Sequence, residues 1–145
     1  MIGVAYANAV LIDTSATVAL ADVDDAYHSI ASECFAKMQT DVLFCAVDVT
    51  AHESFTRLRY DGSLDLALKG FGMLRASRVR TIAFGEEDEH KAIELVQKYA
   101  DKSLSYHDAL CAAVMLRYDM FRIFSFDSDF WTFGFELVPG TTKPR

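Results

Sequence analysis

Residues 104–119 read LSYHDALCAAVMLRYD, and this stretch decides how the chain is organised. The eight residues that follow Asp108, from 109 to 116, carry no charge. A helix that is apolar on all sides is usually buried inside a protein. We therefore predict a buried helix over residues 106–117. Its first turn nevertheless contains the carboxylate of Asp108. A charged group at the start of a buried helix requires a reason, which we look for in the other segments of the chain.

Short apolar runs and longer helical patterns alternate along the rest of the chain. The periodicity predicts helices within residues 13–22, 25–39, 50–60, 63–77 and 86–100. Buried strands are predicted at AVLI (9–12), DVLFCAV (41–47), VRTIAF (79–84) and RIFSF (122–126), and FELV (135–138) is a candidate fifth strand. Strands that alternate with helices favour a parallel sheet covered on both faces. We expect one domain over residues 1–145, an α/β fold in which a mostly parallel sheet of four to five strands forms the middle layer of an α/β/α sandwich.

Three of the predicted helices carry apolar residues at helical spacing, and we expect these residues to face the core. They are Tyr27, Ile30, Ala31, Cys34, Phe35 and Met38 in the helix predicted within 25–39, Leu64, Leu68, Phe71 and Leu74 in the helix within 63–77, and Ile93, Val96 and Tyr99 in the helix within 86–100.

Acidic residues stand where the predicted strands end or where helices begin. Asp13 follows the first strand, Asp127 follows the fourth, and Asp129 comes two residues later. Glu53 and Asp108 lie in the first turns of two helices. Ligand sites of such sheets lie outside the carboxyl ends of the strands. We therefore expect some of these acids to meet at one edge of the sheet.

Each of these acids also has a local explanation that involves no ligand. Thr50-x-x-Glu53 has the form of a capping box, and Ser105-x-x-Asp108 has the same form with a shorter acid. Asp13 and Asp127 can serve as helix N-caps. Capping is the commoner role for any single acid, but it does not require the acids to meet. Two carboxylates about 4 Å apart repel by about 4 kcal/mol at an effective dielectric constant of about 20. A cluster therefore needs shared protons or a cation, and oxygen ligands favour Mg²⁺ or Mn²⁺.

Composition and charge restrict the class of protein. The net charge of −7 disfavours nonspecific nucleic-acid binding. Residues 57–80 nevertheless hold six basic residues and two acids, so this segment either contacts an acidic partner or is a solvated helix face.

The three cysteines have no metal-binding or disulfide spacing, which fits reduced thiols in the cytoplasm. No run reaches the roughly 18 apolar residues of a membrane span.

Four segments of the chain resemble the PIN-domain family. They are LIDTSATVAL (11–20), VTAHESFTRLR (49–59), LSYHDALCAAVM (104–115) and FSFDSDFWTFGFELVP (124–139). The resemblance covers nearly the whole chain and keeps the family's order of acids. It implies a Mg²⁺- or Mn²⁺-dependent ribonuclease acting on single-stranded RNA. Many small members are VapC-like toxins that a cognate antitoxin holds inactive, so the resemblance also implies a small antitoxin partner and a homodimer.

The resemblance assigns roles to particular residues by position. The acids that match the family's catalytic cluster are Asp13, Glu53, Asp108 and Asp127, with Asp13, Asp108 and Asp127 as the principal metal ligands and Glu53 binding metal directly or through water. Asp129 is an auxiliary acid that could replace Asp127. Ser15 and Ser125 match hydroxyl positions that support the acids. Arg57 and Arg59 are candidate contacts to RNA phosphates, with solvent exposure as the equal alternative.

Other residues and other functions compete with this interpretation. We interpret His52 and His107 as surface or internally hydrogen-bonded histidines, since neighbouring residues on a helix point about 100° apart and would not share a metal with the adjacent acid. The aromatic residues Phe130, Trp131 and Phe133 could stack on a base but are more typical of a core. The alternative functions are a stand-alone PIN nuclease in RNA processing without an antitoxin, and a non-catalytic PIN-fold binding module. A phosphoacceptor receiver domain is disfavoured, because one acid instead of a pair follows the first strand and no lysine follows the fourth.

Overall fold

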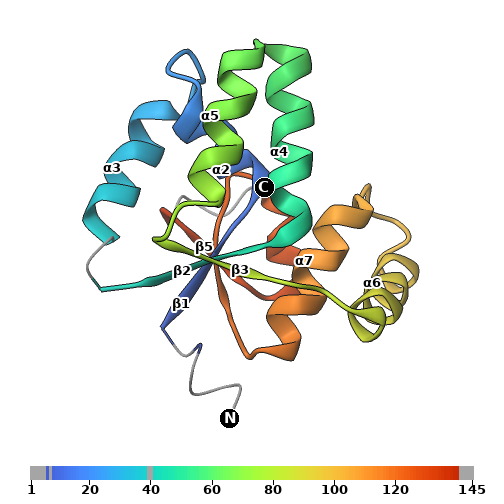
Figure 1. Cartoon of the computed structure of the whole chain (residues 1–145). Helices are drawn as coiled ribbons and strands as arrows, with labels where there is room; N and C mark the ends of the chain where they lie inside the picture. The colour runs from blue at the N-terminus through green and yellow to red at the C-terminus, as the bar shows by residue number, and fades with distance from the viewer. Residues whose placement is uncertain (1–5, 7, 39–40, 141–145) are drawn as a thin grey trace.

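A five-stranded parallel sheet forms the centre of the molecule, in the strand order β3-β2-β1-β4-β5 (Figure 1). The structure, a computed structural model, describes residue 6 and residues 8–38 and 41–140. The predicted α/β fold and the candidate fifth strand are both confirmed. The strands are β1 (Ala9–Ile12), β2 (Leu43–Val47), β3 (Val79–Ile82), β4 (Arg122–Phe124) and β5 (Glu136–Val138).

Helices cover both faces of the sheet, because successive strand side chains point to opposite faces. Val10 and Ile12 pack with α2 (Thr14–Ala21), α3 (His28–Met38) and α5 (Leu64–Leu74), whereas Leu11 packs with α6 (Glu86–Lys98) and α7 (Tyr106–Arg117). The remaining helices are α4 (Asp48–Asp61), which packs on α2 and α5, and the 3₁₀ helix η1 (Ser128–Phe133), which contacts α7. Within the described ranges, none of these helices combines the length and the apolar character that crossing a bilayer requires.

The position of β1 determines where a site can form. β1 pairs with β2 on one side and with β4 on the other, so the chain moves away from β1 in opposite directions along the sheet. This arrangement opens a crevice outside the carboxyl ends of β1 and β4. The residues that follow these two strands, and the first turns of the neighbouring helices, therefore lie at the crevice.

The predicted buried helix is confirmed with its predicted bounds. α7 spans Tyr106–Arg117, and every residue from His107 to Met115 is buried. Ser105 is the N-cap, and its hydroxyl accepts a hydrogen bond from the backbone N–H of Asp108 over 3.0 Å. The apolar turns fix the helix in the core, so its first turn is held in a fixed position at the crevice.

The capping box predicted at Thr50 and Glu53 is wrong. α4 begins at Asp48, so Thr50 is the third residue of the helix rather than its cap, and Val47 is an N-cap without a side-chain hydrogen bond. The Thr50 hydroxyl instead lies 2.8 Å from Nε2 of His107 on α7. The predicted start failed because the helix follows β2 without an intervening turn.

Several predicted apolar stripes are also wrong in part. Ile30 on α3, Leu64 and Leu68 on α5 and Ile93 on α6 are exposed, as is Tyr27 before α3. The buried contacts of these helices come largely from small residues, namely Ala31, Ala67, Gly70 and Ala92, together with Leu74, which was predicted to face the core, and Leu95. A Cβ atom on Gly70 would lie 2.4 Å from Cδ1 of Leu58. α5 therefore approaches α4 closely at Gly70, whereas Leu64 and Leu68 stay exposed.

Candidate metal centre

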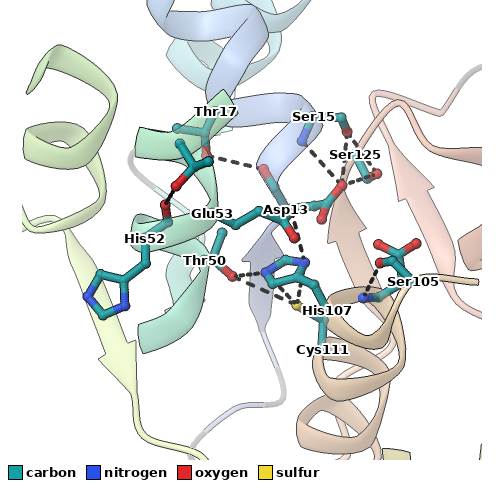
Figure 2. A network of polar contacts seen from close by, with 12 residues as sticks. Asp13, Ser15, Thr17, Thr50, His52, Glu53, Ser105, His107, Cys111 and Ser125 are labelled. Atoms are coloured by element: carbon teal, nitrogen blue, oxygen red, sulfur yellow. Dashed lines mark hydrogen bonds and ion pairs between the residues drawn. The ribbon is translucent and has the colours of Figure 1, made fainter. Parts of the chain in front are cut away.

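Asp13 lies at the end of β1 and caps α2 with its side chain (Figure 2). It is 2% exposed. Its Oδ2 atom accepts hydrogen bonds from the hydroxyls of Ser15 and Ser125, at 3.0 and 2.9 Å, and from the backbone N–H of Ser15 at 3.3 Å. Its Oδ1 atom is buried without a hydrogen-bond partner among the described residues. One oxygen is thus fully engaged by the protein, and the other is left for a ligand.

Ser15 and Ser125 connect the ends of β1 and β4. Their hydroxyl oxygens lie 3.1 Å apart. Ser15 Oγ also accepts the backbone N–H of Phe126 at 2.9 Å, and Ser125 Oγ accepts that of Asp127 at 3.0 Å. The two serines therefore hold Asp13 and the backbone before η1 in one hydrogen-bonded unit.

Three further carboxylates lie together at the crevice. Asp108, Asp127 and Asp129 each offer a carboxylate oxygen, and the three oxygens lie within 4.8 Å of one another. Asp127 caps η1, and its Oδ1 accepts the backbone N–H of Asp129 at 2.9 Å. We call Asp13, Asp108, Asp127 and Asp129 the acid cluster. The cluster combines Asp13, which follows β1, with Asp108 on α7 and with Asp127 and Asp129 at the start of η1, so Asp13 meets residues more than 90 positions later in the sequence.

Burial and mutual repulsion disfavour negative charge in the acid cluster. Burial raises the pKa of Asp108 to about 7, and the charges of Asp13 and Asp127 add to this increase, while hydrogen bonds with Ser105 oppose it. Burial also raises the pKa of Asp127. The hydrogen bond from the Asp129 backbone N–H opposes this increase, the charges of Asp129 and Asp13 add to it, and the charge of Arg57 opposes it. Among the described residues, no lysine or arginine forms an ion pair with Asp13, Asp108 or Asp127. The cluster is therefore suited to a bound cation.

Glu53 contacts His107, the histidine that lies next to Asp13. Its Oε1 lies 3.3 Å from Nδ1 of His107, and its side chain is 33% exposed. In a neutral imidazole ring, Nδ1–H donates to the Glu53 carboxylate and Nε2 accepts the hydroxyl proton of Thr50. The structure thus places Glu53 next to His107, and His107 in turn next to Asp13 and Cys111.

The interpretation of His107 as an internally hydrogen-bonded histidine is confirmed, because the side chain is buried and contacts Thr50 and Glu53 of α4. The sequence did not indicate that one of its partners is a predicted site residue, since that contact joins two helices that are far apart along the chain. His52 fits the expectation: it is exposed and stacks beside Phe71, away from the acids.

Among residues 6, 8–38 and 41–140, two groups of side chains could hold a metal, and their chemistry differs. Asp13, His107 and Cys111 offer one oxygen, one nitrogen and one sulfur within 4.8 Å. Burial and the charge of Asp13 raise the pKa of Cys111 well above its ordinary value, so the thiol stays protonated and is a poor ligand. The acid cluster offers only oxygen ligands, which suit Mg²⁺ and Mn²⁺. The residues present therefore fit the divalent cation that the resemblance implied.

The two arginines proposed to contact phosphate lie in different places. Arg57 lines a hollow together with Asp127, and its charge acts on that carboxyl group. Arg59 lines a separate hollow with Phe55 and Tyr60. The two side chains point in different directions because residues two positions apart on a helix are rotated by about 200°. The structure brings Arg57, but not Arg59, to the acids.

Comparisons with known proteins agree with the fold. The model of the PIN domain family matches residues 10–136. The crystal structure of VapC20 from Mycobacterium tuberculosis, a toxin that cleaves the sarcin-ricin loop, is similar with a TM-score of 0.81 and 24% identity, over 87% of this chain and 95% of that chain. VapBC2 from Rickettsia felis, solved bound to a DNA fragment from its promoter, gives a TM-score of 0.68 and 12% identity, over 89% and 96%.

A third solved structure, the protein PAE2754 from Pyrobaculum aerophilum, gives a TM-score of 0.63 and 18% identity, over 92% of this chain and 91% of that chain. The comparison with curated proteins gave no significant match. At these identities the solved structures establish the fold alone, and the family is established by the match over residues 10–136.

Proposed function

The chain belongs to the PIN-domain family, and on this premise we propose that it is a Mg²⁺- or Mn²⁺-dependent endoribonuclease that cleaves single-stranded RNA. The observation that carries the proposal is the acid cluster, in which Asp13 and Asp108 are buried and Asp127 and Asp129 are partly buried. In the described part of the chain, no arginine or lysine forms an ion pair with Asp13, Asp108 or Asp127. The unpartnered Oδ1 of Asp13 supports a ligand at this position.

The proposed roles follow from the contacts of each side chain. Asp13, Asp108 and Asp127 would hold the cation, with Asp129 as an additional or substitute ligand. Ser15 and Ser125 hold Asp13 in place through its Oδ2 atom. His107 orients Glu53, which would bind metal directly or through water. When bound, a divalent cation supplies acidification of a water molecule and stabilisation of charge on the phosphate.

Cleavage of a single-stranded RNA tests the proposal. Wild type is expected to cleave with Mg²⁺ or Mn²⁺ and to stop when EDTA is added. Asp13→Asn and Asp108→Asn keep the size of the side chains, remove their charge and should abolish cleavage. Asp65→Asn, at an exposed position on α5, is the matched control and should cleave like wild type. Equal cleavage by wild type in EDTA would show that the metal mechanism is wrong.

We further propose that the protein is the toxin of a toxin–antitoxin pair in the cytoplasm. Support comes from its similarity to VapC20 and VapBC2. An acid cluster without a paired internal cation would also attract a basic side chain of an antitoxin. Co-purification with a small protein that blocks cleavage would support this role. If no co-expressed partner protein inhibits cleavage, the stand-alone nuclease without an antitoxin becomes the better description. The expected homodimer remains a prediction, which light scattering tests.

A further inference from the structure

An exposed tyrosine lies beside the acid cluster. Tyr27, in the turn between α2 and α3, is 48% exposed. Its ring stacks on that of Phe126, with centroids 4.5 Å apart and an angle of 11° between the planes. Phe126 immediately precedes Asp127, so the stacked pair begins next to one of the proposed metal ligands. An aromatic ring that is half exposed next to a catalytic centre can accept a second ring.

The stacked pair forms one wall of a hollow of about 400 Å³. Arg57 and Asp127 line the same hollow, as does Ser15 of the hydrogen-bonded unit around Asp13. The hollow therefore adjoins the acid cluster and combines a flat aromatic surface with a cation. These are the two features by which proteins bind single-stranded nucleic acids: aromatic rings stack with bases, and basic side chains contact phosphates.

The turn that carries Tyr27 is held in place by its own hydrogen bonds. Oδ1 of Asp25 accepts the backbone N–H of Tyr27 at 2.9 Å, and the carbonyl of Asp25 accepts that of His28 at 3.0 Å. Nδ1 of His28 lies 2.7 Å from the carbonyl oxygen of Ala19 in α2. The aromatic surface is thus preformed, and a ligand that uses it does not have to order the turn.

We propose that this hollow is a nucleobase-binding subsite, in which an unpaired base of the RNA stacks on Tyr27 while Arg57 contacts the adjacent phosphate. The proposal rests on the proposed function, because it places the base beside the phosphate that is cut. Stacking on an aromatic face tolerates every base, so the subsite selects single-stranded RNA over paired RNA rather than one sequence.

The aromatic residues considered from the sequence lie elsewhere. Phe130 is fully buried, and Trp131 and Phe133 pack against the core cluster under α7. This confirms the interpretation that they are core residues, and it leaves Tyr27 as the exposed ring of the aromatic pair at the site.

Binding of a short single-stranded oligoribonucleotide that contains one 2-aminopurine tests the subsite. The measurement is made with Ca²⁺ in place of Mg²⁺, and a gel verifies that the oligonucleotide stays intact. Stacking quenches the fluorescence of this base. Tyr27→Ala is expected to weaken binding about 10-fold, within the range that base stacking supplies, and to relieve the quenching. Tyr27→Phe keeps the ring and should behave like wild type. Tyr60→Ala, at an exposed position on α4 away from the hollow, is the matched control.

Two further variants separate the stacking contact from a folding defect and from the phosphate contact. Tyr27→Leu keeps an apolar contact with Phe126 but cannot stack a base, so it should lose as much binding as Tyr27→Ala. Arg57→Met should weaken binding mainly at low salt, because a phosphate contact releases counterions and a stacked base does not. If Tyr27→Leu, folded by circular dichroism, binds and quenches like wild type, the subsite is wrong and cleavage by wild type still upholds the nuclease. If wild type never cleaves RNA but the Tyr27 variants lose binding, the nuclease is wrong, and the hollow binds an unpaired base without cleavage of the adjacent phosphate.

Discussion

Two buried aspartates at the carboxyl ends of strands have different surroundings in this molecule. Asp88, in the first turn of α6 after β3, is 3% exposed. Its carboxylate accepts the backbone N–H of Gly85 at 2.9 Å and a two-pronged contact from Arg117, with Nε at 2.8 Å and Nη2 at 2.9 Å. Asp13, after β1, is equally buried, but the hydrogen bonds that it receives from the described residues come from hydroxyls and an amide, all on one oxygen.

The difference teaches that burial of a carboxylate does not by itself indicate a binding site. Asp88 has a cation from the protein itself, and its role is structural. In the acid cluster the described part of the chain supplies hydrogen-bond donors but no lysine or arginine in an ion pair with Asp13, Asp108 or Asp127. It also brings three carboxylates within repulsive distance of one another. A site for an external cation is therefore recognised by the missing internal partner. Both regions can be altered separately, which allows this distinction to be tested.

The largest expected effect is on catalysis. Asp13→Asn or Asp108→Asn should reduce RNA cleavage by at least about 1,000-fold, since several kcal/mol of charge stabilisation depend on the cation they would hold. Asp88→Asn should leave the rate per folded molecule near that of wild type. The rates are compared after the folded fraction of each variant has been determined. A large loss in Asp88→Asn at full folding would remove the distinction between the two regions.

Removal of the internal cation should mainly affect stability. Arg117→Met leaves the Asp88 carboxylate buried without its partner, and we expect it to lower the free energy of unfolding by roughly 3 kcal/mol. Urea denaturation measures this loss. Arg122→Met, at an arginine that forms an exposed hydrogen bond with Asn8, is the control and should change stability little. An unchanged midpoint for Arg117→Met would mean that Asp88 does not need the guanidinium.

Added metal should stabilise only a chain with an intact acid cluster. At about 100 times the dissociation constant, Mn²⁺ should raise the unfolding free energy of wild type by about 2.7 kcal/mol. Asp88→Asn should gain a similar amount relative to its own metal-free state, and Asp108→Asn should gain much less. Thermal unfolding with and without Mn²⁺ measures the gain. A full gain in Asp108→Asn would exclude that carboxylate as a ligand.

The raised pKa of Asp108, about 7, predicts a pH dependence of the metal-free protein. The folded state holds a proton that the unfolded state releases between about pH 4 and pH 7, so stability falls as pH rises through this window. Asp108→Asn removes this dependence and should be more stable than wild type at about pH 8, by on the order of 2 kcal/mol. Denaturation in EDTA at several pH values measures both effects. Parallel curves for wild type and the variant would contradict the assignment.

The smallest effect concerns the histidine between the two helices. His107→Leu removes the donor that orients Glu53 and should weaken Mn²⁺ binding about 10-fold, as loss of such supporting contacts commonly does. An asparagine amide can take the place of the Nδ1–H donor, so His107→Asn should keep most of the affinity. Titration of the metal without RNA gives both constants. Wild-type affinity in His107→Leu would show that Glu53 holds its position without the histidine.

Local patterns predicted the framework well because strands and helices are largely specified by short-range periodicity. The buried runs gave the strands of the sheet within a few residues, and the all-apolar pattern gave α7 its correct bounds. The position of Asp13 and Asp127 after β1 and β4 also followed, since the carboxyl ends of parallel strands share one edge of the sheet. The exposure of Leu64, Leu68 and Ile93 was not predictable, because it depends on which small residues allow helices to approach closely.

The sequence by itself therefore determined the sheet, the buried helix and the edge at which the acids gather, since these depend on the order and spacing of residues along the chain. Only the tertiary structure decided which buried acid has a cation of its own. Asp88 on α6 forms an ion pair with Arg117 on α7, whereas Asp108 lies close to the carboxylates of Asp127 and Asp129. The physical reason is that neutralising a buried charge depends on the side chains that packing brings within a few ångströms, and the sequence does not record those distances. The same reason explains why Tyr27 and Phe126, 99 positions apart along the chain, form one aromatic surface beside the site.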